Sequence, residues 1–175
     1  MPYSLSLAIA AGAVALALTP LARELALRVG ALDHPGPRRI HAAPTPRLGG
    51  LAIAAAVLLV AWAARVLPGP ARELDPRPLL GLTCAALPIL LLGVFDDIRG
   101  AGPWAKLAVQ ACAALVLAAF GYGVPLLSNP FGDTLVTGVW SVPLTVLWVI
   151  VLTNAINLID GLDGLAAGLV AIACA

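Results

Sequence analysis

Two adjacent aspartates, Asp96 and Asp97, directly follow the apolar segment LLLGVF. Neighbouring carboxylates repel each other, and the negative end of a helix dipole raises their energy further. A bound divalent cation would offset both effects, and Mg²⁺ prefers one or two carboxylates together with substrate phosphates. The pair therefore predicts an acidic, metal-binding centre. The alternative is that it marks the aqueous boundary of a membrane span or forms ion pairs with Arg99 or Lys106.

A second segment, NAINLIDGLDGL, carries amide and acid side chains at every third position. They are Asn154, Asn157, Asp160 and Asp163. Residues three apart on a helix are neighbours, so successive members can point into one polar pocket. We expect Gly161 and Gly164 to end the helix, where glycines let backbone amides approach a phosphate or a base. The alternative assigns the Asp-Gly pairs to turns and Asp163 to the cap of the next helix.

A third segment, HPGPRRIHAAPTPRLGG, is both basic and rich in proline. Its prolines stiffen the chain, and its cationic side chains suit phosphate oxygens. These side chains are Arg38, Arg39, His41 and Arg47. The segment predicts a clamp for a polyanionic substrate, with Arg47 as its strongest candidate. The alternative is that the arginines only hold this connection on the cytoplasmic side of a membrane.

Lys106 lies at the start of the apolar segment that follows the acid pair. Its ammonium group could neutralise a substrate phosphate. It could equally reach the membrane interface while its stem packs on apolar surface. The sequence leaves both interpretations open.

The elements that must position these residues are membrane helices. Of all residues 61% are hydrophobic and 11% charged, which places the chain in a bilayer. About twenty apolar residues are needed to cross one as a helix. Five segments meet that need: Ser4 to Leu21, Gly49 to Leu67, Leu79 to Phe95, Trp104 to Phe120 and Val139 to Ile156. A sixth, from Leu165 to Ala175, is too short to span, so the prediction is an all-α bundle forming one transmembrane domain over residues 1–175.

The distribution of basic residues predicts the orientation, because Lys and Arg are retained on the cytoplasmic side. Seven of the ten fall in the first and third connections, and none falls in the fourth. This places the N-terminus outside and all three polar segments at the cytoplasmic face. The net charge of +1 and the lack of a continuous basic stripe argue against a nucleic-acid partner.

In this combination the three segments resemble the polyprenyl-phosphate N-acetylhexosamine-1-phosphate transferases, which belong to glycosyltransferase family 4. The matching blocks are HPGPRRIHAAPTPRLGG, then GVFDDIRG with Lys106 and Gln110 downstream, then TNAINLIDGLDGLAAG. The form of the first and last blocks is more similar to the branch that uses UDP-N-acetylglucosamine than to the branch that uses UDP-N-acetylmuramoyl-pentapeptide. The family makes the first lipid-linked sugar of bacterial cell-wall and surface polymers.

The resemblance implies a reaction and a role for each candidate residue. A phosphate oxygen of polyprenyl phosphate, such as undecaprenyl phosphate, attacks the β-phosphorus of a UDP-sugar and releases UMP. Mg²⁺, or Mn²⁺ in its place, would bridge the diphosphate. Asp96 and Asp97 match the catalytic acids, with Asp97 orienting or deprotonating the lipid phosphate. The implied metal ligands are Asp96, Asn154, Asn157 and Asp160. The implied substrate contacts are Arg39, His41, Arg47, Lys106, Asp160, Gly161 and Asp163.

The resemblance also raises an expectation about length, and rival interpretations stay open beside it. Family members continue for several more spans, so we expect this chain to be the N-terminal half of the fold and to depend on the rest for activity. One rival is an intramembrane prenyltransferase, whose spaced acids Asp160 and Asp163 would fit, although the basic segment would then have no role. The other is a transporter or non-catalytic membrane module, which predicts acids at mid-membrane depth rather than at helix ends.

Overall fold

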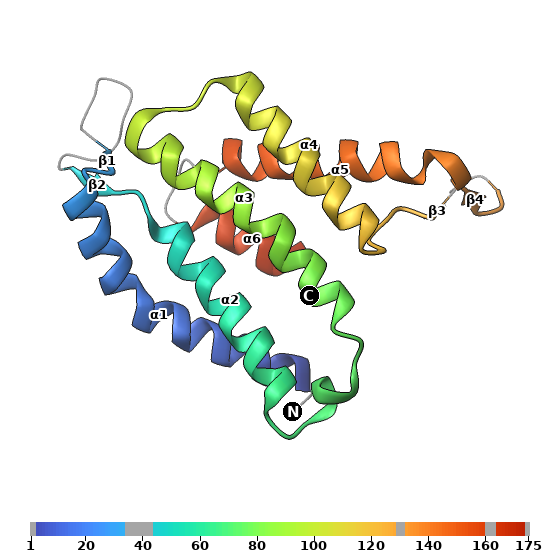
Figure 1. Cartoon of the computed structure of the whole chain (residues 1–175), viewed down its shortest axis with the longest axis horizontal. Helices are drawn as coiled ribbons and strands as arrows, with labels where there is room; N and C mark the ends of the chain where they lie inside the picture. Colours follow the sequence, from blue (N-terminus) through green and yellow to red (C-terminus); the bar gives the residue numbers. More distant parts are fainter. Residues whose placement is uncertain (1–2, 34–43, 129–131, 160–163, 174–175) are drawn as a thin grey trace.

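The computed structural model describes residues 3–33, 44–128, 132–159 and 164–173, and these residues form a helical bundle (Figure 1). Its helices are α1 (Tyr3–Val29), α2 (Gly49–Val66), α3 (Arg77–Arg99), α4 (Pro103–Ala119), α5 (Ser141–Ile159) and α6 (Leu165–Ala173). Two short 3₁₀ helices, η1 (Pro70–Glu73) and η2 (Gly138–Trp140), precede α3 and α5. The predicted all-α membrane bundle is confirmed.

In the part of the chain that the structure describes, four helical segments are long and apolar enough to cross a membrane. They are Tyr3–Val29, Gly49–Val66, Arg77–Arg99 and Gly138–Ile159. The predicted fourth span, α4, is apolar but has only 17 residues. At 1.5 Å per residue it is about 25 Å long, slightly less than the hydrocarbon thickness of a typical bilayer. Five predicted spans thus become four of full length and one shorter helix.

Several helices run past the apolar segments that predicted them. α1 continues to Val29, where Arg28 forms an ion pair with Glu24 one turn earlier. It stops at Gly30, whose positive φ of 74° lets the Ala31 amide donate back to the Ala26 carbonyl at 2.9 Å. α3 and α5 extend in the same way, through the acid pair and through Asn157 respectively. The polar residues of interest therefore lie in the last turns of these two helices.

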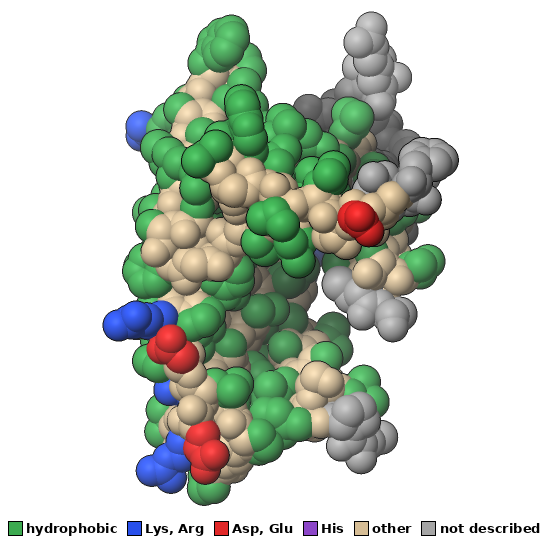
Figure 2. Space-filling view, turned by 90° about the vertical axis from the view of Figure 1, so that its right-hand side faces the viewer, with side chains coloured by type: hydrophobic (Ala, Val, Ile, Leu, Met, Phe, Trp, Pro, Cys, Tyr) green, Lys and Arg blue, Asp and Glu red, His purple; other side chains and the backbone are tan. Residues whose placement is uncertain are grey.

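Small side chains allow the helices to approach each other. α1 packs on α2, α3 on α4, and α4 on α5. The buried hydrophobic positions among the described residues are almost all alanine, including Ala26, Ala52, Ala56, Ala113 and Ala114. Larger apolar side chains point outward and cover most of the face seen in Figure 2. Close packing through small residues with large apolar groups outside is typical of helices surrounded by lipid.

Two short antiparallel strand pairs close connections between helices, and the sequence did not predict them. β1 (Leu32–Asp33) pairs with β2 (Thr45–Pro46), and β3 (Leu126–Leu127) pairs with β4 (Leu135–Val136). The first pair ties the end of α1 to the start of α2, and the Arg47 amide adds a bond of 3.1 Å to the Ala31 carbonyl. This pairing fixes the backbone that leads into Arg47.

Candidate active site

The structure brings residues from all three polar segments to one pocket. The pocket has a volume of about 360 Å³ and lies where α2 begins and where α3 and α5 end. These ends lie on the same side of the bundle, at the upper left of Figure 1. Its polar lining consists of Arg47, Asp96, Asp97 and Asn157. Residues far apart in the sequence thus share one cavity.

Asp96 is held by two hydrogen bonds. Its Oδ2 accepts one from the Lys106 ammonium at 2.7 Å, and its Oδ1 accepts one from the Ala101 amide at 2.7 Å. Gly100, with a positive φ of 77°, makes the tight turn between α3 and α4 that permits both contacts. The ion pair foreseen as an alternative for the acid pair therefore forms at Asp96. Each carboxylate oxygen has a further lone pair for a cation.

Asp97 differs from its neighbour because its carboxylate makes no hydrogen bond or ion pair with any described residue. It is half-buried on the same wall of the pocket. The charges of Arg47 and Lys106 attract it, and the charge of Asp96 repels it. Among the described residues, Asp97 is consequently the acid of the pair whose two oxygens are both free for a ligand.

Arg47 reaches the pocket from the short link between β2 and α2. Its guanidinium donates to Oδ1 of Asp33 at 2.5 Å. Asp33 is a residue that the sequence analysis missed, although an acid placed just before a basic segment is a usable signal. The pair holds Arg47 beside the acids, where its remaining N–H groups can reach a phosphate.

A smaller pocket of about 170 Å³ adjoins the first, with Asp96 and Asn157 in the walls of both. Lys106, Gln110, Thr153 and Asn154 complete its polar lining. Asn154 donates to Oε1 of Gln110 at 2.8 Å, which links α5 to α4. Sequence analysis assigned no role to Gln110, since an amide in an apolar helix does not reveal its partner.

Several predicted site residues lie outside the described part of the chain. They are Arg38, Arg39, His41, Asp160, Gly161 and Asp163. Of the predicted residues inside it, Asp96, Asp97, Lys106, Arg47, Asn154 and Asn157 all line one or both pockets. The roles assigned to them stay predictions.

The donor atoms around the two pockets suit a hard cation. Within residues 3–33, 44–128, 132–159 and 164–173, no three His, Cys, Asp or Glu side chains gather into a metal site. What the described residues do offer is two carboxylates, with amide oxygens on the facing helix. Oxygen-only sets of this kind, left open for phosphate oxygens, fit Mg²⁺ or Mn²⁺ better than zinc.

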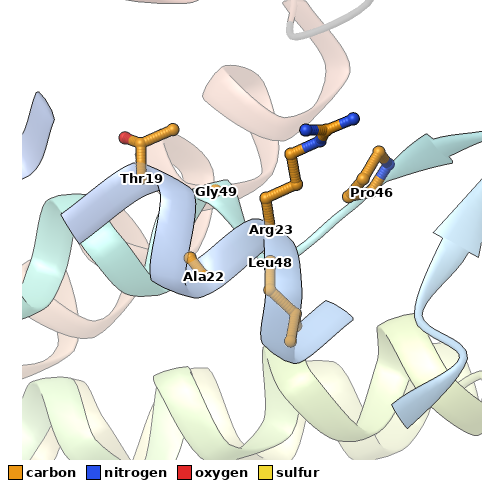
Figure 3. Close-up of a pocket in the computed structure, with 6 residues that line it drawn as sticks. All are labelled: Thr19, Ala22, Arg23, Pro46, Leu48 and Gly49. Atoms are coloured by element: carbon orange, nitrogen blue, oxygen red, sulfur yellow. The ribbon is translucent and has the colours of Figure 1, made fainter. Parts of the chain in front are cut away.

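A separate pocket of about 150 Å³ lies between α1 and the start of α2 (Figure 3). Arg23 extends from α1 alongside Pro46 and Gly49, and Leu48 lies in the wall of this pocket and of the acidic one. No acid is among the described residues that line this pocket. It is therefore distinct from the acidic centre.

Known proteins of one family are similar to this chain over most of its length. The family model described as "Glycosyl transferase family 4" matches residues 79–175, more than half of the chain. A relative from Bacillus subtilis (strain 168), "Probable undecaprenyl-phosphate N-acetylglucosaminyl 1-phosphate transferase", is 37% identical over 155 residues, covering 88% of this chain and 41% of the relative. The "Decaprenyl-phosphate N-acetylglucosaminephosphotransferase" of Mycolicibacterium smegmatis is 37% identical over 151 residues, with coverages of 84% and 37%.

A third relative comes from Escherichia coli (strain K12). It is the "Undecaprenyl-phosphate alpha-N-acetylglucosaminyl 1-phosphate transferase", 30% identical over 150 residues, with coverages of 85% and 39%. The chain thus spans about two fifths of the length of these relatives. No solved structure gives a significant match. The family match and the resemblance carried by the three motifs agree, and the chain belongs to glycosyl transferase family 4.

Proposed function

We propose that this chain is part of a membrane enzyme that transfers N-acetylglucosamine-1-phosphate from UDP-N-acetylglucosamine to a polyprenyl phosphate. The observation that carries the proposal is the single pocket shared by Arg47, Asp96, Asp97 and Asn157. Cationic and acidic groups in one cavity suit a metal-bound diphosphate better than either group alone. The relatives, whose names specify this sugar and this class of lipid, support the same choice.

Each residue has a proposed task in the reaction. Arg47 binds the diphosphate of the nucleotide-sugar and keeps its position through Asp33. Asp97 would orient the phosphate of the lipid for attack on the β-phosphorus, and a cation held nearby would supply the positive charge that offsets the repulsion between the two groups. That phosphate has a second pKa of about 6 and is mostly dianionic at neutral pH, so it needs positioning more than deprotonation.

The remaining groups complete the cation site and the nucleotide site. Asp96, Asn154 and Asn157 supply oxygens to the cation, together with Asp160. Mg²⁺, when bound there, neutralises charge that develops on the departing UMP. Lys106 keeps Asp96 in place and adds positive charge to the pocket. Asp163, Gly161, His41 and Arg39 are proposed as further contacts to the substrate.

The proposed setting is a bacterial cell membrane with the pocket facing the cytoplasm. A cytoplasmic pocket gives the site access to a soluble UDP-sugar. Basic residues at this end of the helices support that orientation, with the N-terminus outside. The polyprenyl chain would remain in lipid while its phosphate reaches the acids at the end of α3.

Release of UMP tests the proposal. Membranes that contain the full-length protein are supplied with UDP-N-acetylglucosamine, polyprenyl phosphate and Mg²⁺, and UMP is measured against time. We expect release that requires both substrates, with a diphosphate-linked sugar lipid as the second product. Release of UDP in place of UMP, or no dependence on the lipid, would contradict the proposed reaction.

Lys106→Met is expected to lower the rate of UMP release by about thirtyfold, because Asp96 loses the ion pair at 2.7 Å that holds it. Lys106→Arg keeps the charge and should remain within about fivefold of the unaltered protein. Arg72→Met, a change in η1 before the start of α3, serves as the control for loss of a cation and should have no effect. A rate unchanged in Lys106→Met would show that the pair is unimportant.

A further inference from the structure

Gln110 is a buried polar residue in the middle of an apolar helix. It lies on α4, on the side from which it bonds to α5, and only 7% of its surface is exposed. An amide buried in this way is costly unless it is hydrogen-bonded. Its Oε1 is bonded, since it accepts from Nδ2 of Asn154 at 2.8 Å. The two residues are 44 positions apart.

The same bond helps to determine how the Asn154 amide is turned. Nδ2 of Asn154 donates a second hydrogen bond, also of 2.8 Å, to the carbonyl of Ile150. An amide nitrogen has two N–H groups, so both are used. The oxygen Oδ1 accepts no hydrogen bond from any described residue. The atom of the Asn154 amide that remains available to a ligand is therefore the acceptor Oδ1.

The free oxygen belongs to a residue that lines the smaller pocket. That pocket is also lined by Gln110, Lys106, Asp96 and Asn157. If the Asn154 amide turned over, Nδ2 would replace Oδ1, and a donor would replace an acceptor. Gln110, which presents an oxygen to Nδ2, opposes this turn.

We propose that Gln110 is a positioning residue that holds the Asn154 amide so that its Oδ1 faces a divalent cation. This inference rests on the proposed function, which needs such a cation. A residue that hydrogen-bonds to a metal ligand and orients it typically contributes 10–100-fold to metal affinity, which is lost when the residue is removed. Gln110 does not touch the cation and acts only through Asn154.

Binding of Mn²⁺ to the purified full-length protein, followed by electron paramagnetic resonance, tests the inference without relying on activity. Gln110→Met keeps the length of the side chain and removes the acceptor, so we expect Mn²⁺ to bind about tenfold more weakly. Gln110→Glu keeps an acceptor for Nδ2 and should not weaken binding. Gln110→Leu provides a second apolar variant should the Met variant fold poorly. Wild-type affinity in both apolar variants would overturn the inference.

Asn154→Ala separates positioning from a general effect on packing. On its own it should weaken Mn²⁺ binding by a similar factor. Gln110→Met added to Asn154→Ala should then cause no further loss, because the residue through which Gln110 acts is gone. A second tenfold loss in the double variant would show that Gln110 acts independently of Asn154 and would overturn the inference.

The two proposals can fail separately. A protein that binds Mn²⁺ with the expected dependence on Gln110 but releases no UMP would contradict the proposed function and leave the positioning role intact. A protein that releases UMP but binds Mn²⁺ equally well with Met or Leu at position 110 would contradict only the positioning role.

Discussion

Asp97→Asn is expected to lower the rate of UMP release by about a thousandfold, or roughly 4 kcal/mol in the activation barrier. Asp97 is the acid of the pair whose carboxylate is free of hydrogen bonds and ion pairs within the described residues, and it lines the larger pocket. Asparagine has nearly the same shape but lacks the negative charge that helps to attract a cation to the pocket. The rate is measured at saturating substrates in membranes with matched amounts of protein.

The same variant distinguishes positioning from proton transfer when the rate is followed against pH. Positioning predicts an equal loss at every pH, since the lipid phosphate loses its proton without help near pH 6. A loss that becomes much smaller at high pH would instead assign Asp97 the role of a base. Asp75→Asn, a change just before the start of α3, is the matched control and should leave the rate unaltered. Full activity in Asp97→Asn would contradict the proposed site.

Removal of divalent cations is expected to abolish UMP release, with a fall of at least about a thousandfold. The pocket then holds adjacent acids facing a doubly charged lipid phosphate and a diphosphate, and the described cations that line it, Arg47 and Lys106, carry too little charge to balance them. The measurement uses a chelator, followed by gel filtration and titration with Mg²⁺ or Mn²⁺. Both ions should restore the rate.

Na⁺ at equal ionic strength is the control for simple screening of charge. It should restore nothing, because a monovalent ion cannot bridge the acids and the diphosphate in the same way. Undiminished UMP release in the absence of divalent ions would contradict the proposed chemistry. Partial recovery with Na⁺ would indicate that the pocket needs charge neutralisation rather than a bound ion.

The helices could be predicted because the thickness of a bilayer sets the length of an apolar segment. The same reasoning placed Asp96 and Asp97 at the end of α3, where the structure has them in the last turn. It failed at the ends of α1 and α5, since polar residues can continue a helix beyond the membrane. It also counted α4, Pro103–Ala119, as a full span, although this helix has 17 residues and falls among the shorter apolar helices.

The contacts within the site could not be predicted, because they depend on how the helices are rotated against each other. The bond between Gln110 and Asn154 requires particular faces of α4 and α5 to meet. The ion pair of Asp33 with Arg47 requires the pairing of β1 with β2. Strands of two residues are too short to leave a recognisable pattern in the sequence. The sequence left both Lys106 and Arg99 open as partners of Asp96. The turn at Gly100 decides between them, because it brings Lys106 to Asp96.

The proposed site requires above all a cation shared between the end of α3 and the end of α5. A crystal structure of the full-length protein grown with Mn²⁺ tests this requirement directly. The anomalous difference map should show a peak in direct contact with a carboxylate oxygen of Asp96 and with an amide oxygen from α5, at Asn157 or Asn154. A peak bound elsewhere, with Asp96 and the asparagines facing only water, would contradict it.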